Sequence, residues 1–118
     1  MNRRIARLND MFREEISDLL RRQIRDPRLE VFITITRVEV SADFSYARVF
    51  ISVMGTDEEK ARALRGLESA SSFLRRELGN RLKMRRAPEL SFRQDDSLER
   101  GAEMLDLLQH VEEEEEPS

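Results

Sequence analysis

The chain has 118 residues, which is enough for one domain with a modest core. Charged residues make up 38% of it and aromatic residues 6%, so we expect a highly charged surface over an aliphatic core. It contains no cysteine, which excludes disulfides, thiolate catalysis and cysteine metal sites. We find no apolar run long enough to span a membrane and no secretory signal, and therefore expect a cytoplasmic protein without a membrane partner.

Charge is unevenly distributed along the chain. Residues 1–94 contain 20 Lys and Arg against 14 Asp and Glu, whereas residues 95–118 contain 1 against 10. The formal net charge of -3 therefore hides a basic body and an acidic C-terminal segment. Because a local basic surface is sufficient to attract a polyanion, a pI near 5.3 does not argue against nucleic acid as a partner.

The first half of the chain predicts one helix and two strands. Apolar residues at three- and four-residue spacing predict an amphipathic helix from about Arg3 to Arg25, which Asp26-Pro27 ends. β-branched residues predict a strand over 31–40, with a bulge or twist near Thr36-Arg37 that changes the buried side. A short polar loop leads to a second strand over 46–54, and we expect the two strands to pair antiparallel.

The longest predicted helix begins after Thr56, which starts a capping-box pattern. Leucines at helical spacing continue its apolar face as far as Leu82. The small residues 70–72 interrupt this helix, because a serine hydroxyl competes for backbone groups. We therefore predict a kink there, with Ala70 and Ser72 as the kink residues.

The C-terminal third begins with a stop signal at Ala87-Pro88 and a short predicted strand over 89–94. Asp95 and Asp96 offer caps for a last helix from about Leu98 to His110. The apolar residues expected to make its contacts are Met104, Leu107, Leu108 and Val111.

Together these elements predict a single α+β domain with the order helix–strand–strand–helix–kink–helix–strand, followed by a short C-terminal helix. We assign this domain to residues 1–111. Five consecutive glutamates, 112–116, repel one another and bury nothing, so we expect residues 112–118 to form a disordered acidic tail.

A dense basic run is the strongest functional signal. Over twelve residues it contains six positive charges against the single acid Glu77, whereas an ordinary solvated helix face interleaves both signs. This excess favours a nucleic-acid contact over the solvated face that is its competing interpretation. The predicted contact residues are Arg75, Arg76, Arg81, Lys83, Arg85 and Arg86, with Arg3, Arg4 and Arg7 as a second patch.

Signals for catalysis are weak. The only histidine, His110, lies beside the acidic tail, and no carboxylate pair falls in an apolar segment that would perturb its pKa. Asp95-Asp96 is explained more simply as a turn and helix cap than as a cation site. The glycines do not have the spacing of a phosphate-binding loop. We therefore expect no enzyme activity, no metal and no cofactor.

The order of the elements resembles that of the type II KH domain, an RNA-binding module, and the sequence resembles the ribosome-binding factor A family. The resemblance covers about residues 3–108 and depends on the joint order and spacing of short motifs. These are Asp26-Pro27-Arg28, Val38-Glu39-Val40-Ser41, Asp43, Ala47, Val49, Leu78-Gly79, Leu82, Arg85, Pro88-Glu89-Leu90-x-Phe92, Asp96-x-Leu98 and Gly101.

The resemblance implies a bacterial factor that binds the free small (30S) ribosomal subunit and its 16S rRNA and assists late maturation and rRNA processing. Two departures qualify the mode of binding. The G-x-x-G loop with which KH domains grip single strands does not occur, and Ser72 stands where the family has glycine, although Ala70 is retained. We therefore expect a monomer that reads folded RNA by charge and shape, with no DNA partner.

Two other functions remain open from the sequence. A different ribosome-associated stress factor could have the same basic surface without a role in maturation. A protein-interaction adaptor could instead use the C-terminal helix and the acidic tail on a basic partner.

Overall fold

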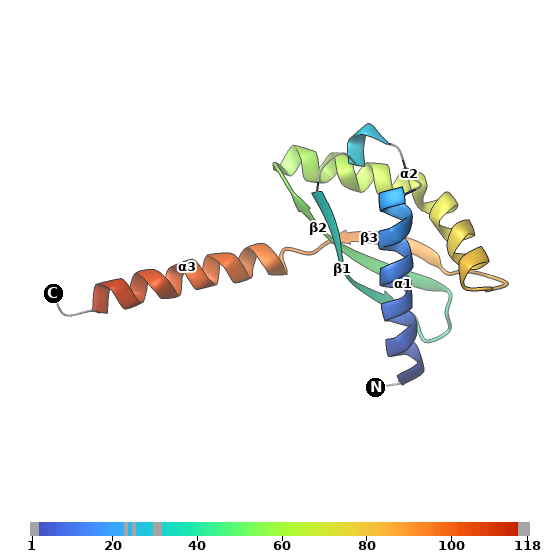
Figure 1. Cartoon of the computed structure of the whole chain (residues 1–118), viewed down its shortest axis with the longest axis horizontal. Coiled ribbons are helices and arrows are strands. Elements are labelled where there is room, and N and C mark those ends of the chain that lie inside the picture. Colours follow the sequence, from blue (N-terminus) through green and yellow to red (C-terminus); the bar gives the residue numbers. More distant parts are fainter. Residues whose placement is uncertain (1–2, 23, 25, 30–31, 116–118) are drawn as a thin grey trace.

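The computed structural model describes residues 3–22, 24, 26–29 and 32–115. Their elements are α1 (Arg3–Arg22), a short 3-10 helix η1 (Pro27–Leu29), β1 (Phe32–Val40), β2 (Tyr46–Met54), α2 (Asp57–Arg81), β3 (Glu89–Gln94) and α3 (Ser97–Glu115) (Figure 1). The predicted α+β class and the predicted order of elements are confirmed. None of the helices within the described residues is long and apolar enough to cross a membrane.

The three strands form one sheet in the order β1-β2-β3. β1 pairs antiparallel with β2, as predicted, and β2 pairs parallel with β3. The register between β1 and β2 shifts between Ile35 and Arg37, which confirms the predicted bulge. Because of this extra residue, Val38 keeps the same buried face as Ile35 and stays opposite the core residue Val49.

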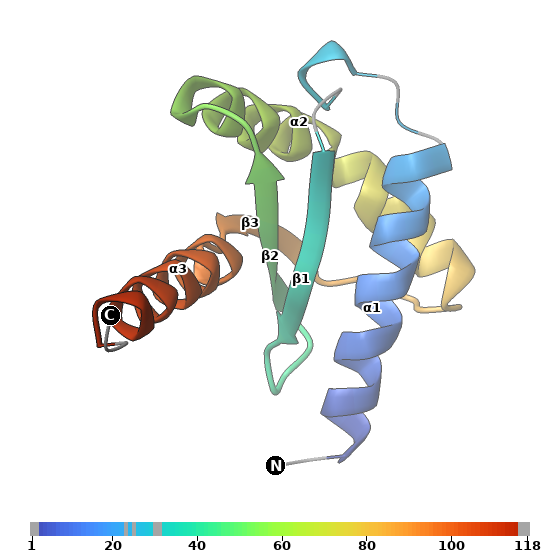
Figure 2. The ribbon, with the colours of Figure 1, turned by 60° about the vertical axis from the view of Figure 1, so that its left-hand side comes forward.

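One face of the sheet is covered by α1 and α2 (Figure 2). The helix side chains that pack there are fully buried and recur at helical spacing, whereas the β2 residues alternate as a half-buried strand requires. The core contains Phe12, Ile16 and Leu19 from α1, Ala47, Val49, Ile51 and Val53 from β2, Leu67, Leu74 and Leu78 from α2, and Phe92 from β3.

The connection after α1 is fixed by local bonds. α1 ends at Arg22 and not at Arg25, the end predicted for it, and residues 23 and 25 lie outside the described part of the chain. The Asp26 carboxylate accepts hydrogen bonds from the backbone N–H of Arg28 at 2.9 Å and from its Nη2 at 2.7 Å. Leu29 then packs on α2 at Gly66, where an added Cβ would lie 3.0 Å from the leucine side chain. The Asp26-Pro27-Arg28 motif is therefore a structural brace.

α2 bends but is not interrupted. It is one continuous helix of 25 residues, so the small residues 70–72, where a kink was predicted, do not end it. Figure 1 shows a change of direction part-way along it. The Ser71 hydroxyl donates to the carbonyl of Glu68 at 2.8 Å, a bond of the kind that bends helices without ending them.

The end of α2 reverses the chain tightly. Lys83 has a left-handed φ of 54°, and the N–H of Met84 donates to the carbonyl of Gly79 at 2.9 Å. This is the bonding pattern of a Schellman motif, with lysine at the position where glycine is usual. The helix therefore ends at Arg81. The sequence had suggested that it continues to the stop signal at Ala87-Pro88.

α3 extends away from the sheet (Figures 1 and 2). The four residues expected to pack against the domain are exposed: Met104 by 58%, Leu107 by 63%, Leu108 by 53% and Val111 by 46%. The helix also continues past His110 to Glu115, because glutamate is a good helix former. Residues 112–115 are therefore helical, although they were predicted to be disordered. The rest of the expected tail, residues 116–118, lies outside the described residues.

These burial differences predict contrasting effects of two matched substitutions. Leu74→Ala should lower the free energy of unfolding by about 2–5 kcal/mol, because it opens a cavity at a fully buried site. Leu107→Ala should change it by no more than about 0.5 kcal/mol, because that side chain is mostly in solvent. Urea unfolding monitored by circular dichroism measures both. An equal loss in the two variants would show that α3 packs on the domain in solution.

Candidate RNA-binding surface

Three adjoining cavities form a groove on one side of the molecule. The first, of about 570 Å³, is lined by Arg3, Arg4, Arg7, Leu8, Met11, Phe44 and Met84. The second, of about 460 Å³, is lined by Ser72, Arg75, Arg76, Gly79, Asn80, Met84, Arg85, Arg86 and Ala87. The third, of about 420 Å³, is lined by Tyr46, Ser71, Ser72, Arg75, Glu89, Leu90 and Ser91. We call them the apolar cavity, the basic cavity and the sheet-edge cavity.

Shared residues make these cavities continuous. Met84 lines both the apolar and the basic cavity, while Ser72 and Arg75 line both the basic and the sheet-edge cavity. The two arginine patches predicted from distant parts of the sequence therefore meet in one groove. Seven arginines contribute to it, three from the first turns of α1 and four from the end of α2 and the following loop.

The basic cavity is shaped by the reversal between α2 and β3. Arg75 donates from Nε to the carbonyl of Ala87 at 2.8 Å, which holds the loop against the helix. Ala87 is buried, whereas Arg85 and Arg86 beside it are exposed. The loop is thus anchored at its apolar end while its two arginines face solvent.

Positive charge in the groove has little local compensation. The described residues that line the apolar and basic cavities include no acid, and Glu89 is the one acid lining the sheet-edge cavity. No ion pair among the described residues involves Arg3, Arg7, Arg85 or Arg86. Unpaired cations concentrated in a concave surface attract a polyanion strongly.

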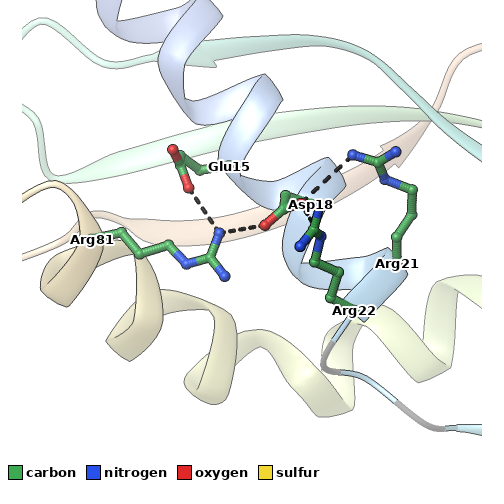
Figure 3. Close-up of polar contacts among 5 residues, drawn as sticks. All are labelled: Glu15, Asp18, Arg21, Arg22 and Arg81. Atoms are coloured by element: carbon green, nitrogen blue, oxygen red, sulfur yellow. Dashed lines mark hydrogen bonds and ion pairs between the residues drawn. The ribbon is translucent and has the colours of Figure 1, made fainter.

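Arg81 lies outside this groove, so the geometry does not support the contact role predicted for it. Its Nη1 donates to Asp18 Oδ2 at 2.7 Å and to Glu15 Oε2 at 2.9 Å, so it joins the end of α2 to α1 (Figure 3). The hydrogen bond from Arg81 is the main reason that the pKa of Asp18 is lowered, and both acids raise the pKa of Arg81. Arg81 therefore positions the helix that carries the groove.

The remaining predicted residues have distinct places. Lys83 is exposed at the turn and lines none of the three cavities, so its contact role is also not supported by the geometry. Ala70 packs partly against the core, and the exposed Ser72 lines the groove. The hydroxyl bond at the bend is made by Ser71, the neighbour of the predicted kink residue Ser72.

Known proteins with similar sequences decide the family. A model of the ribosome-binding factor A family matches residues 4–108. A ribosome-binding factor A of Acetivibrio thermocellus is 48% identical over 105 residues, which are 89% of this chain and 85% of the relative. This chain belongs to the ribosome-binding factor A family.

Solved structures of the family share its fold. The crystal structure of ribosome-binding factor A from Thermus thermophilus is 30% identical, with a TM-score of 0.67 over 76% of this chain and 93% of that one. A homology model of the Thermus thermophilus factor, fitted into a cryo-EM map of a 30S–RbfA complex, is 31% identical. Its TM-score is 0.58 over 82% of this chain and 97% of that one.

Several residues that line the groove were not predicted from the sequence. Phe44, Met11 and Met84 come from a hairpin, a helix and a loop, so no linear pattern unites them. Tyr46 had a usable signal, because its alternation with Ala47 places it on the face of β2 opposite the core.

The structure places the residues that were considered for catalysis and for metal binding. His110 is exposed on α3, and no cluster of three or more metal-binding side chains occurs among the described residues. Asp95 accepts from the N–H of Ser97 at 2.9 Å and from the Thr36 hydroxyl at 2.7 Å. These two bonds hold its pKa at about 2 and support the turn-and-cap interpretation of Asp95-Asp96.

The two roles assigned to arginines predict different stability effects. Arg81→Gln should lower the thermal unfolding temperature at neutral pH, whereas Arg85→Gln should leave it unchanged. Since the pKa of Asp18 is lowered in the native state, its stabilisation is present above the ordinary value of 3.8 and is lost as the pH falls through the lowered value. The gap between wild type and Arg81→Gln should close over that acid range. Differential scanning calorimetry at several pH values tests this, and a gap that persists in full at the acid end would contradict it.

Proposed function

We propose that this protein binds the free small ribosomal subunit through its 16S rRNA and assists late maturation and rRNA processing. The observation that carries the proposal is the groove in which seven arginines converge, with no acid among the described residues that line its apolar and basic cavities. Family membership supports it, since the Thermus thermophilus relative forms a complex described as 30S–RbfA. The contact residues proposed are Arg3, Arg4, Arg7, Arg75, Arg76, Arg85 and Arg86.

Recognition by charge and shape fits this surface better than recognition of a single-stranded sequence. The G-x-x-G clamp of KH domains does not occur in the sequence. On the open face of the sheet, Phe50 is covered by the Arg37 guanidinium, 4.0 Å from its ring centroid, and so is not presented for stacking. Phosphate contacts therefore dominate the proposed recognition of RNA. In this proposal the protein acts as a monomer in the cytoplasm, and its function involves no catalytic step, cofactor or metal.

A sedimentation assay tests the arginine groove. Affinity for purified small subunits should fall as salt rises, because phosphate contacts release counterions. Each lost phosphate contact reduces the magnitude of the negative slope of log affinity against log salt by about 1. Arg85→Gln/Arg86→Gln should therefore bind more weakly at every salt concentration, with a slope that is less steep by about 2.

The matched control is Arg62→Gln/Arg65→Gln, which removes the same charge from exposed positions of α2 outside the groove. It should retain nearly the full affinity and slope. If both double variants behave alike, net charge and not the groove determines binding, and the proposed surface is wrong.

A maturation role makes a cellular prediction that a stress factor does not. Bacteria that lack the gene should accumulate precursor 16S rRNA during unstressed growth, and the wild-type gene should restore processing. The Arg85→Gln/Arg86→Gln gene should restore it poorly, whereas the Arg62→Gln/Arg65→Gln gene should restore it fully. Northern blots of the rRNA ends measure this. Normal processing in the deletion strain would favour the stress-factor alternative.

The adaptor function is a second candidate because α3 exposes its leucines. The partner that binds α3 would be a basic protein with an apolar groove, complementary to the acidic helix and its exposed leucines. In the sedimentation assay, Leu107→Gln/Leu108→Gln would then weaken binding to small subunits but not to isolated 16S rRNA. Unchanged binding to both would remove this candidate.

A further inference from the structure

The apolar cavity differs chemically from the rest of the groove. It combines the apolar side chains of Leu8, Met11, Phe44 and Met84 with three arginines from α1. Its volume of about 570 Å³ falls within the range of about 300–1,000 Å³ that is typical of small-ligand sites. Phe44 is 39% exposed and Met11 41%, so this apolar surface is open to solvent. The composition suits a ligand with an apolar flat body and attached negative charge.

The hairpin holds Phe44 in an uncommon conformation. Its φ of 60° lies in the left-handed region, which is costly for a bulky side chain. The Asp43 carboxylate accepts from the Ser41 hydroxyl at 2.8 Å and from the Ser45 hydroxyl at 2.7 Å, which holds its pKa at about 2. The N–H of Phe44 donates to the carbonyl of Ser41 at 2.9 Å. This bonding fixes the loop in the conformation that brings the ring to the cavity.

The arginines of this cavity occupy an unfavourable place on their helix. Arg3 and Arg4 lie in the first turn of α1, at the positive end of the helix dipole, Arg7 lies one turn further on, and the first turn contains no acid. Positive charge at that end is unfavourable for the helix, and an anion bound nearby would offset the cost. The cluster adjoins an apolar cavity, so the anion is expected to carry an apolar group.

We propose that the apolar cavity receives one unstacked nucleobase of the RNA bound in the groove, with its flanking phosphates on Arg3 and Arg7. The inference rests on the proposed function, because the base must belong to the strand that the basic cavity contacts. Met84 lines both cavities, so a chain of alternating bases and phosphates can pass from one to the other. The base would stack on Phe44, a contact that tolerates any base identity.

The chain's own acidic helix is a poorer occupant. Parallel pairing places Tyr46 opposite Glu89 at the start of β3 and Ile51 opposite Gln94 at its end. α3 therefore leaves the sheet at the end remote from the hairpin that carries Phe44. The segment that leads into α3 is also held at that end, because the Thr36 hydroxyl donates a hydrogen bond to the Asp95 carboxylate at 2.7 Å.

Methionine methyl signals test the proposal in the full chain. The probes are an RNA hairpin with one bulged adenosine and the same hairpin fully paired, titrated into protein labelled with ¹³C at the methionine methyls. The bulged RNA should shift the Met11 and Met84 signals, whereas the paired RNA should leave Met11 unmoved. Met54 and Met104, exposed by 70% and 58% outside the groove, are internal controls that should not shift.

A matched pair of variants separates stacking from folding. Phe44→Ala should weaken binding of the bulged hairpin roughly tenfold and leave the paired hairpin unaffected. Phe32→Ala removes an equally large ring, 70% exposed at the far end of β1, and should change neither. Loss of equal size for both hairpins in Phe44→Ala would indicate a structural role and overturn the proposal.

Three further outcomes also overturn it. One is an equal Met11 shift with paired RNA, and another is failure of both hairpins to bind at low salt. The third is a larger Met11 shift with a peptide of residues 97–115 than with either RNA, which would assign the cavity to an acidic helix. Sedimentation with small subunits decides the proposed function independently of all three.

Discussion

The parallel pairing of β2 and β3 is the constraint on which the functional surface depends. Adjacent parallel strands cannot be joined by a tight turn, so the chain must cross back over the sheet between them. α2 makes this crossing, and the reversal after Arg81 then brings the chain down to Glu89 opposite Tyr46. Arg85 and Arg86 of the basic cavity lie in this reversal, and Arg75 and Arg76 lie on the last turns of α2 before it. Their convergence is therefore a consequence of strand topology as much as of the basic sequence.

α1 completes the groove because Arg81 holds it against the end of α2. The ion pairs of Arg81 with Glu15 and Asp18 join the middle of α1 to the end of α2. With the two helices held together, the first turns of α1 lie beside Met84, and two basic segments distant in sequence line one surface. A contact that removes one positive charge from the surface thus organises the others.

Sequence patterns predicted the secondary-structure elements well, but predicted less well which side chains face the groove. Broken alternation near Thr36-Arg37 correctly predicted the bulge, because burial of one face leaves no other register. Arg81 was predicted as a contact residue from charge density alone. Its spacing of seven from Leu74 places it on the edge of the buried face of α2, a signal that was present. Lys83 gave no signal, since glycine or asparagine is usual in a left-handed helix end.

The separation of the two charges explains how an acidic protein can present a basic surface. Gln94 pairs five residues along β2 from Tyr46, so α3 leaves the sheet about 16 Å from the hairpin end. The helix then extends about 28 Å further away from the sheet. Physiological salt screens charges over about 8 Å, so the acids of α3 do not neutralise the arginines of the groove. The local arrangement, and not the net charge of -3, determines which partner the groove attracts.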